Sequence, residues 1–232
     1  MLELLYDRRL EILEKGLEHL WLTGLSVLLA AIVGITLGIL LTRRKRLATP
    51  VIGFANVVQT VPSIALLGFM IPLIGIGAAP AIVALFLYAL LPIIRNTYAG
   101  ISDVDGAITE AGAGLGMTDR QLLPRVELLL ALPVIFAGLR TATVINVGVA
   151  TLAAFIGAGG LGEFIFTGIA LNNTDLILLG AIPSALLAIL LDLGLGFVEK
   201  RVRRLLVPLL LVIGLVIAGV TLATFVSSDS SE

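Results

Sequence analysis

This chain of 232 residues contains no cysteine, and only 13% of its residues are charged. Without thiols there is neither a disulfide framework nor thiolate chemistry, so cysteine usage says nothing about the redox compartment. A Gly-x-x-x-x-Gly-Lys-Ser/Thr phosphate loop is also absent, because the glycine-rich runs at 112–116 and 157–162 lack the lysine. We therefore expect no ATP hydrolysis by this chain, no catalytic residue and no metal site.

What the chain has in abundance is apolar surface: 59% of its residues are hydrophobic and the mean hydropathy is +1.13. A soluble core of this length does not need so much apolar surface. Several apolar runs of about 20 residues are long enough to cross the hydrocarbon core of a bilayer as helices. In lipid each backbone N–H and C=O must be paired within its segment, and no alternating pattern of ten-residue strands occurs. The sequence therefore predicts an all-α polytopic membrane protein.

The apolar runs predict about six transmembrane helices, or five if the last one is peripheral. Their approximate ranges are 20–41, 51–74, 81–94, 132–156, 176–197 and 205–226. Together they make one transmembrane domain over residues 20–226, interrupted by a polar segment at 95–127 and followed by a polar tail at 227–232. The polar segment is the least lipid-like part of the domain, so it is the first place to expect a contact with another molecule.

Lysine and arginine collect in loops that face one side of the membrane. The strongest cluster is Arg43-Arg44-Lys45-Arg46, and placing it on the cytoplasmic side also places the segment 95–127 and the basic block 200–204 there. The loops then assigned to the outside, residues 75–80 and 157–175, contain no lysine or arginine. This orientation predicts a multi-pass membrane protein with both termini outside.

Residues 1–19 combine leucines with charges at a spacing close to that of an amphipathic helix. We expect an interfacial helix on the outer leaflet. The alternative is a solvated extension of the first span. His19 and Trp21 stand where this segment meets the membrane, which suits interface anchors better than a metal site.

The polar segment contains signals for two short helices. Thr118-Asp-Arg-Gln121 matches a capping box, in which the threonine and glutamine side chains pair with free N–H groups at a helix start. Before it, Asp103 or Asp105 can cap a helix, which Gly114 and Gly116 can end in left-handed conformations. The pattern predicts helix, sharp turn and helix on the cytoplasmic face. Such a hairpin either simply joins two spans or lets another protein approach closely at the glycine turn.

The same segment resembles the EAA motif of membrane subunits of bacterial ATP-binding-cassette (ABC) importers. In that motif Glu-Ala-Ala is followed by glycine and then by Ile-x-Leu-Pro. Glu110 and Ala111 match, and Gly112 replaces the second alanine. Gly116 lies at the correct distance, whereas Leu129 stands in place of the proline. This departure leaves the geometry at the end of the second helix open.

The resemblance implies a type I ABC importer permease fold in a bacterial or archaeal cytoplasmic (inner) membrane. In this fold the loop is a coupling helix that docks on an ATPase subunit. The ATPase-coupling residues carried over are Glu110, Ala111, Gly112 and Gly116, with Asp119 and Arg120 as neighbouring contacts. It also implies the partners: ABC ATPase subunits that bind ATP and Mg²⁺, a second permease, identical or paralogous, and an extracytoplasmic substrate-binding protein. The lipid bilayer is a further partner, no nucleic acid is expected, and this chain itself needs no cofactor.

Three further segments, residues 59–68, 90–98 and 154–163, resemble permease subunits of osmoprotectant importers. This resemblance implies a translocation path for a quaternary ammonium compound such as glycine betaine, carnitine or choline. Methionine-type permeases share the glycine-rich element, so an amino-acid importer is the alternative. A secondary transporter or channel subunit is the alternative from another class, but no inverted repeat or filter-like sequence is visible.

Polar groups and helix-breaking residues inside the spans are candidates for the translocation path or its gate, because irregular backbone in a membrane must face protein or a cavity. The candidates are Asn56, Gln59, Thr60, Pro62 and Ser63 in the second span, Thr141 and Asn146 in the fourth, and Gly157, Gly159 and Gly160 on the outer side. Helix packing through small and polar residues, and an ordinary helix-ending loop, explain the same residues.

Two ionisable residues lie inside apolar runs, Arg140 in the fourth predicted span and Asp192 in the fifth. Charges at such depth are costly and usually paired. We hypothesise that these two form a pair. The alternative is that each side chain reaches the cytoplasmic interface separately.

Overall fold

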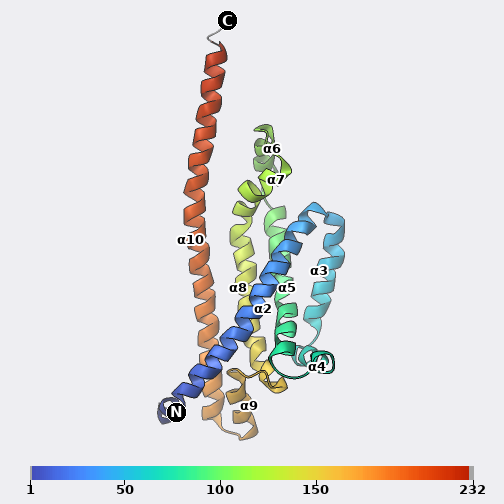
Figure 1. Cartoon of the computed structure of the whole chain (residues 1–232), viewed down its shortest axis with the longest axis vertical. Helices are drawn as coiled ribbons and strands as arrows, with labels where there is room; N and C mark the ends of the chain where they lie inside the picture. The colour runs from blue at the N-terminus through green and yellow to red at the C-terminus, as the bar shows by residue number, and fades with distance from the viewer. Residues whose placement is uncertain (1, 230–232) are drawn as a thin grey trace.

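The computed structural model describes the backbone of residues 2–229 and the side chains of residues 4–202 and 204, and within this part every regular element is a helix (Figure 1). In chain order the elements are α1 (Leu2–Asp7), α2 (Arg9–Arg43), α3 (Lys45–Thr60), α4 (Ser63–Ile74), α5 (Ala78–Ser102), α6 (Gly106–Gly114), α7 (Asp119–Leu122), the π-turn η1 (Leu123–Glu127), α8 (Leu128–Ala153), the 3₁₀ turn η2 (Ala154–Ile156), α9 (Gly162–Ala170) and α10 (Thr174–Asp229). The predicted all-α class is confirmed.

Four described helices are long and apolar enough to cross a membrane. They are α2, α5, the continuous run Asp119–Ile156 that includes α8, and the first part of α10, Thr174–Val202. The pair α3 and α4 passes the same test as a broken span, with a bend of 97° between the two halves. The described residues therefore supply four or five spans, at the positions of the first five predicted ones.

Helix α10 covers both the fifth and the sixth predicted spans without a turn between them. The side chains of the sixth predicted span, residues 205–226, and of the tail at 227–232 lie outside the described residues. The position of the carboxyl terminus outside the cell therefore stays a prediction.

The amino-terminal helix differs from its predicted boundary. α2 begins at Arg9 and runs without a break to Arg43, a length of about 50 Å at 1.5 Å per residue. No proline interrupts residues 9–43, and Gly16 and Gly24 do not break the helix. Only the short α1 is separate, so most of the predicted interfacial helix 1–19 is the outer end of the first span, as in the alternative interpretation.

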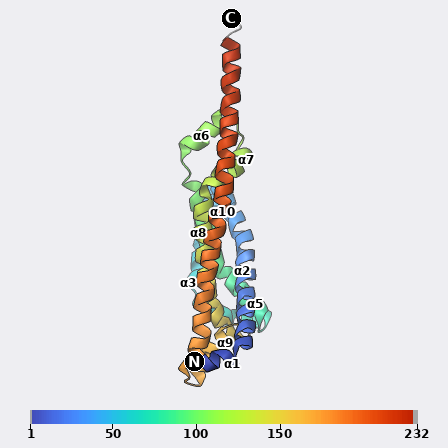
Figure 2. The same cartoon turned by 90° about the vertical axis from the view of Figure 1, so that its left-hand side faces the viewer.

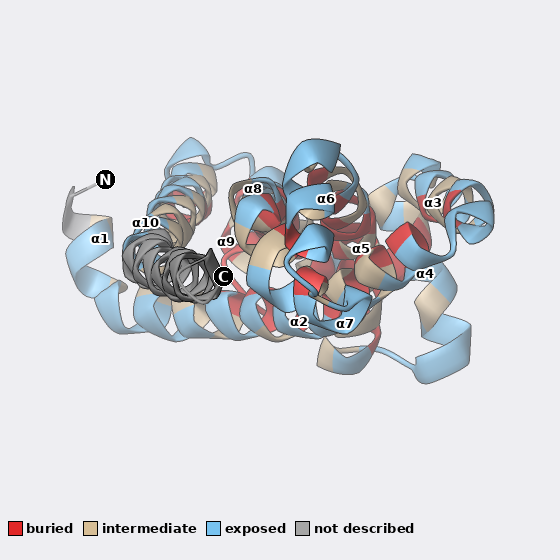
Figure 3. Cartoon of the chain, turned by 90° about the horizontal axis from the view of Figure 1, so that it is seen from above, coloured by how far each residue is buried: buried red, intermediate tan, exposed pale blue. Residues whose placement is uncertain are grey.

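Helix α5 lies at the centre of the bundle, between α2 and α8 (Figure 3). These helices approach closely because small residues face their neighbours. A Cβ atom added at Gly138 of α8 would lie 2.8 Å from the Pro92 carbonyl oxygen, and one added at Gly38 of α2 would lie 2.5 Å from Thr97 Cβ. α10 packs on α8, while α3 and α4 pack on α5, which gives a layered bundle.

The two ends of the bundle carry different elements (Figures 1 and 2). At one end, which we call the inner end, α6 and α7 project beyond the corner between α2 and α3. At the opposite, outer end lie α4, α9 and the loop at residues 157–161. The basic corner at residues 43–46 thus shares an end with α6 and α7, as the distribution of positive charge predicts.

Candidate coupling site and translocation path

The coupling segment, residues 103–127, begins with a capped helix. The Asp105 side chain accepts a hydrogen bond of 2.9 Å from the Ala107 backbone N–H at the start of α6. Of the two aspartates that could cap this helix, Asp105 is the one that does. A side-chain acceptor at this position satisfies one of the N–H groups that the first helical turn leaves free.

α6 ends in a Schellman turn. The Gly116 N–H donates to the Ala113 carbonyl at 2.9 Å, and the Met117 N–H donates to the Gly112 carbonyl at 3.1 Å. Gly116 has a φ of +83°, the left-handed conformation that such a turn requires and that glycine adopts without a Cβ clash. Gly114 instead stays helical, so only one of the two glycines has the predicted role.

Gly112, which replaces the second alanine of the motif, is buried where α6 packs on α7. A Cβ atom there would lie 2.6 Å from Leu122 Cδ2. The glycine therefore lets the two short helices pack more closely than alanine would. The helix-turn-helix is a packed unit, and its apolar contact is made inside the segment.

α7 begins with the predicted capping box, in which the Thr118 N–H donates to Gln121 Oε1 at 2.9 Å. It then continues through η1 into α8 with no break in the chain of helical residues from Asp119 to Ile156. Leu129, at the position where the motif has proline, lies inside α8. Leucine in place of proline at this position is therefore accompanied by an unbroken helix, which joins α7 to the membrane span α8.

The outward surface of the coupling segment mixes charge with exposed apolar groups. Glu110, Ala111, Asp119 and Arg120 are all exposed. On the same segment, Ile108 and Leu115 are 44% and 62% exposed. Apolar side chains beyond the membrane-spanning helices, rimmed by charges, are typical of a protein contact surface.

The candidates in the second span gather at the break between α3 and α4. α3 ends at Thr60, whose hydroxyl donates to the Val57 carbonyl at 2.7 Å, and Pro62 precedes the first residue of α4. The Tyr88 hydroxyl of α5 donates to the Val61 carbonyl and so satisfies one backbone group freed by the break. Asn56 and Thr60 are exposed, and Gln59 and Ser63 are partly exposed. A broken span with polar side chains at the break is a feature of transport proteins.

The candidates in α8 fall into two environments. Asn146 is fully buried, and its Nδ2 donates to the Leu85 carbonyl of α5 at 3.0 Å, so it fastens α8 to α5. Thr141 is exposed and lines a cavity of about 450 Å³ together with Arg140 and Asp192. Of these two candidates, Thr141 is therefore the one that lines a cavity.

Arg140 and Asp192 form the hypothesised pair. Arg140 Nε lies 2.7 Å from Asp192 Oδ1, and Nη2 lies 2.7 Å from Oδ2, so the contact is bidentate. Glu199 adds a longer contact, with its Oε2 3.9 Å from Arg140 Nη1. The pair joins α8 to α10 and compensates two charges inside apolar helices.

The glycines on the outer side belong to a tightly packed contact, which we call the outer junction. It consists of residues 157–163 together with Lys15 and Glu18 of α2, which contact them. Gly157, Gly159 and Gly160 have φ angles of +73°, +82° and +84°. The Gly160 N–H donates to Glu18 Oε2 at 2.8 Å. Lys15 Nζ lies 3.1 Å from Glu18 and 2.9 Å from Glu163, which closes the junction.

The contacts of α2 at this junction were not anticipated from the sequence. His19 is fully buried, and its Nε2 donates to the Val147 carbonyl at 3.0 Å, so the prediction of an interface anchor is wrong for this residue. Trp21 is 54% exposed, as an interface anchor would be. In the sequence, Glu18 belongs only to the amphipathic pattern of residues 1–19. Its neighbouring residues do not indicate that it accepts a hydrogen bond from a glycine 142 positions later.

The family model described as "Binding-protein-dependent transport system inner membrane component" matches residues 31–204. The chain belongs to this family. The glycine betaine/carnitine/choline transport system permease protein OpuCB of Bacillus subtilis is 50% identical over 192 residues, which is 83% of this chain and 88% of the relative. The osmoprotectant import permease protein OsmW of Salmonella typhimurium is 52% identical over 180 residues, 75% of this chain and 84% of the relative.

A solved structure of the MetNI methionine ABC transporter in an inward-facing conformation resembles this chain with a TM-score of 0.71 and 25% identity. The match covers 84% of this chain and 95% of the other. The predicted type I ABC importer permease fold is thereby confirmed. This family member therefore has the fold of an importer permease and the sequence of the osmoprotectant branch.

Proposed function

We propose that this chain is the membrane permease subunit of an ATP-driven importer and forms the translocation path for a quaternary ammonium osmoprotectant, such as glycine betaine, carnitine or choline. The observation that carries this proposal is the identity of about half of the aligned residues with permeases named for these substrates. The identity to the methionine transporter chain is 25%, so the methionine-type alternative has less support.

ATP hydrolysis belongs to separate subunits in this proposal. The sequence has no phosphate loop, so ATP and Mg²⁺ bind to a partner ATPase and no cofactor binds to this chain. The exposed Glu110, Ala111, Asp119 and Arg120 are where that ATPase docks. Gly116 sets the turn that presents them, and the buried Gly112 lets α6 pack on α7.

The path itself is proposed at the broken span and beside α8, with a second permease, identical or paralogous, completing it. The polar residues at the α3–α4 break and Thr141 supply side chains for a substrate to pass. An extracytoplasmic binding protein delivers the substrate at the outer end, where Gly157 is exposed while Gly159 and Gly160 are buried. The complex lies in the cytoplasmic membrane, with α6 and α7 inside and α9 outside.

The test is transport by the complete complex in proteoliposomes. The permeases, their ATPase and the binding protein are reconstituted with ATP inside, and uptake of radiolabelled glycine betaine, carnitine, choline and methionine is measured. ATP-dependent uptake of at least one quaternary ammonium compound, without uptake of methionine, is expected. Uptake of methionine alone would favour the amino-acid importer, and uptake that persists without the ATPase would overturn the importer function.

A further inference from the structure

An ion pair at the inner end joins the coupling segment to the opposite part of the bundle. Arg43 is the last residue of α2, and Glu127 is the last residue of η1, 84 positions later. Arg43 Nη1 lies 3.3 Å from Glu127 Oε1, and Nη2 pairs with Oε2, so both carboxylate oxygens are engaged. Glu127 is only 8% exposed. The Arg43 side chain is 40% exposed, so the pair is partly buried, and its bidentate contact favours one arrangement of the two elements.

Each partner lies at the end of its element, where the chain passes into the next helix. Glu127 lies in the π-turn through which α7 continues into α8, and α6 packs on α7 and on this turn. Movement of α7 therefore reaches α8 through the π-turn, whereas α6 is joined to α5 through residues 103–105. π-turns are frequent at functional sites because they widen the helix locally.

Arg43 lies at the other side of the contact, at the corner where the chain reverses direction. Arg44 leaves helical geometry with φ −125° and ψ 62°, and α3 begins at Lys45. α3 is the inner half of the broken span whose break carries the candidate polar residues. A force applied to Arg43 thus acts on the corner from which the broken span starts.

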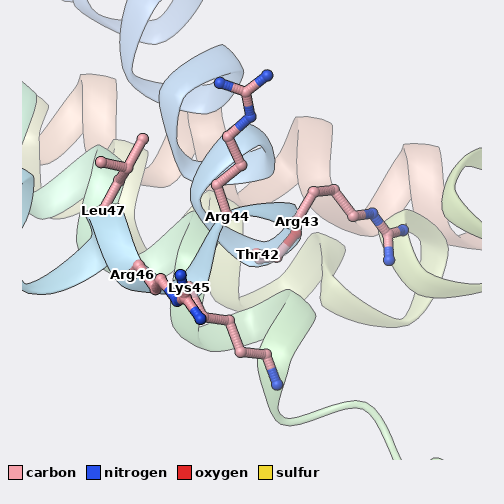
Figure 4. A pocket seen from close by; sticks show the side chains of 6 residues that line it. All are labelled: Thr42, Arg43, Arg44, Lys45, Arg46 and Leu47. Carbon is pink, nitrogen blue, oxygen red and sulfur yellow. The ribbon is translucent and has the colours of Figure 1, made fainter.

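The neighbouring basic residues do not share this contact. Figure 4 shows the side chains of Arg43, Arg44, Lys45 and Arg46 pointing in different directions, with the guanidinium of Arg44 turned away from that of Arg43. Among the described side chains, Arg44 has no ion pair. The four basic side chains therefore diverge, and Arg43 is the one with an ion pair among the described residues. They do not converge to form one anion-binding site.

A cavity of about 210 Å³ lies beside the pair. Its lining includes Thr42, Lys45, Ser102 and Thr109 as well as the two partners. Thr109 belongs to α6 and Lys45 to α3, so the coupling segment and the corner face each other across an open space. Close packing does not join them there, which leaves the Arg43–Glu127 pair as the polar link at this end among the described residues.

We propose that Arg43 and Glu127 are positioning residues that transmit movement of the coupling segment to the corner between α2 and α3, and so to the broken span. The proposal rests on the proposed ATP-driven import. Without the pair, ATPase closure moves α7 and α8 while the broken span follows less closely. ATP is then hydrolysed with less transport.

The test measures transport and ATP hydrolysis on the same reconstituted complexes carrying Arg43→Gln, Glu127→Gln or the exchange Arg43→Glu with Glu127→Arg. Each single variant is expected to lower the substrate transported per ATP hydrolysed about tenfold, a size usual for coupling between sites. The exchange is expected to recover most of this ratio. Arg44→Gln is the matched control, because it removes the same charge from the next residue without breaking an ion pair.

A purely structural role predicts a different result, namely less assembled complex with an unchanged ratio in what assembles. An unchanged ratio in assembled Glu127→Gln complexes would overturn the proposal. If that variant does not assemble, Glu127→Asp, which keeps the charge and shortens the side chain, is measured in its place with the same criterion. Failure of the wild-type complex to transport with ATP would contradict the proposed function instead, so the two failures are distinguishable.

Discussion

The coupling segment and the outer junction are both rich in glycine, yet they use it in opposite ways. Gly116 has no atom within 4 Å of an added Cβ among the described residues, and it serves only to turn the chain. At the outer junction an added Cβ would lie 2.3 Å from Glu18 Oε2 at Gly159 and 1.9 Å from the Thr151 carbonyl oxygen at Gly162. The turn at Gly116 therefore leaves open space around the glycine, whereas the glycines of the outer junction let the chain pack closely on itself.

The largest effect is expected from Gly162→Ala at the outer junction. The new methyl group would collide with the Thr151 backbone, which cannot move without disturbing α8, so the permease should lose about 3 kcal/mol or more of stability. Thermal unfolding in detergent measures this. Gly148→Ala in α8, where no described atom lies within 4 Å of the added Cβ, is the control and should change the midpoint little. Equal midpoints for the two variants would contradict the close packing.

Glu110→Gln should break the coupling segment's function without breaking its fold. Glu110 is exposed, so its replacement should leave the permease fold intact, and under the proposed docking it removes a contact with the ATPase. We expect the affinity for the ATPase to fall about tenfold or more, as for a central interface residue. Co-purification and titration of the ATPase measure it. Glu14→Gln, an exposed glutamate at the outer end, should leave the affinity unchanged.

The link between α8 and α10 gives a third, smaller expectation. Asp192→Asn leaves Arg140 without its bidentate partner, and Arg140→Gln does the reverse, so each should lower the thermal midpoint. The double variant should lose less than the sum of the two single losses, because neither member of the bidentate pair is then left charged without the other. Additive losses would mean that the two side chains act independently of each other.

The smallest effect is expected from Gly112→Ala, which restores the second alanine of the EAA motif. The clash is with Leu122 Cδ2, the end of a flexible side chain, and not with backbone. The cost should stay below about 1 kcal/mol in thermal unfolding. A loss as large as that of Gly162→Ala would remove the distinction between the two glycine regions.

Much of the candidate site was predictable from local patterns. Helix ends depend on neighbouring residues, so the capping box at Thr118 could be inferred from spacing alone. For α6 the spacing left Asp103 and Asp105 open as caps and gave Gly114 the same role as Gly116, and the structure selects Asp105 and Gly116. The Arg140–Asp192 pair could also be predicted from the sequence, because two charges inside apolar spans have few other partners. The burial of Asn146 against α5 could not be predicted, because a polar residue in a helix can face either a cavity or a neighbouring helix.

By itself the sequence determined that the chain forms apolar helices long enough to cross a membrane, that the basic corner 43–46 lies at the same end as the polar segment, and where the chain turns at Gly116. These properties follow from hydropathy, charge and capping, which act over a few residues or along one helix. The tertiary structure alone decided that Arg43 meets Glu127, that Glu18 meets Gly160, and that α2 continues unbroken through residue 19. Such contacts depend on how each helix is rotated and how closely it approaches its neighbours. That is settled by packing across the whole bundle.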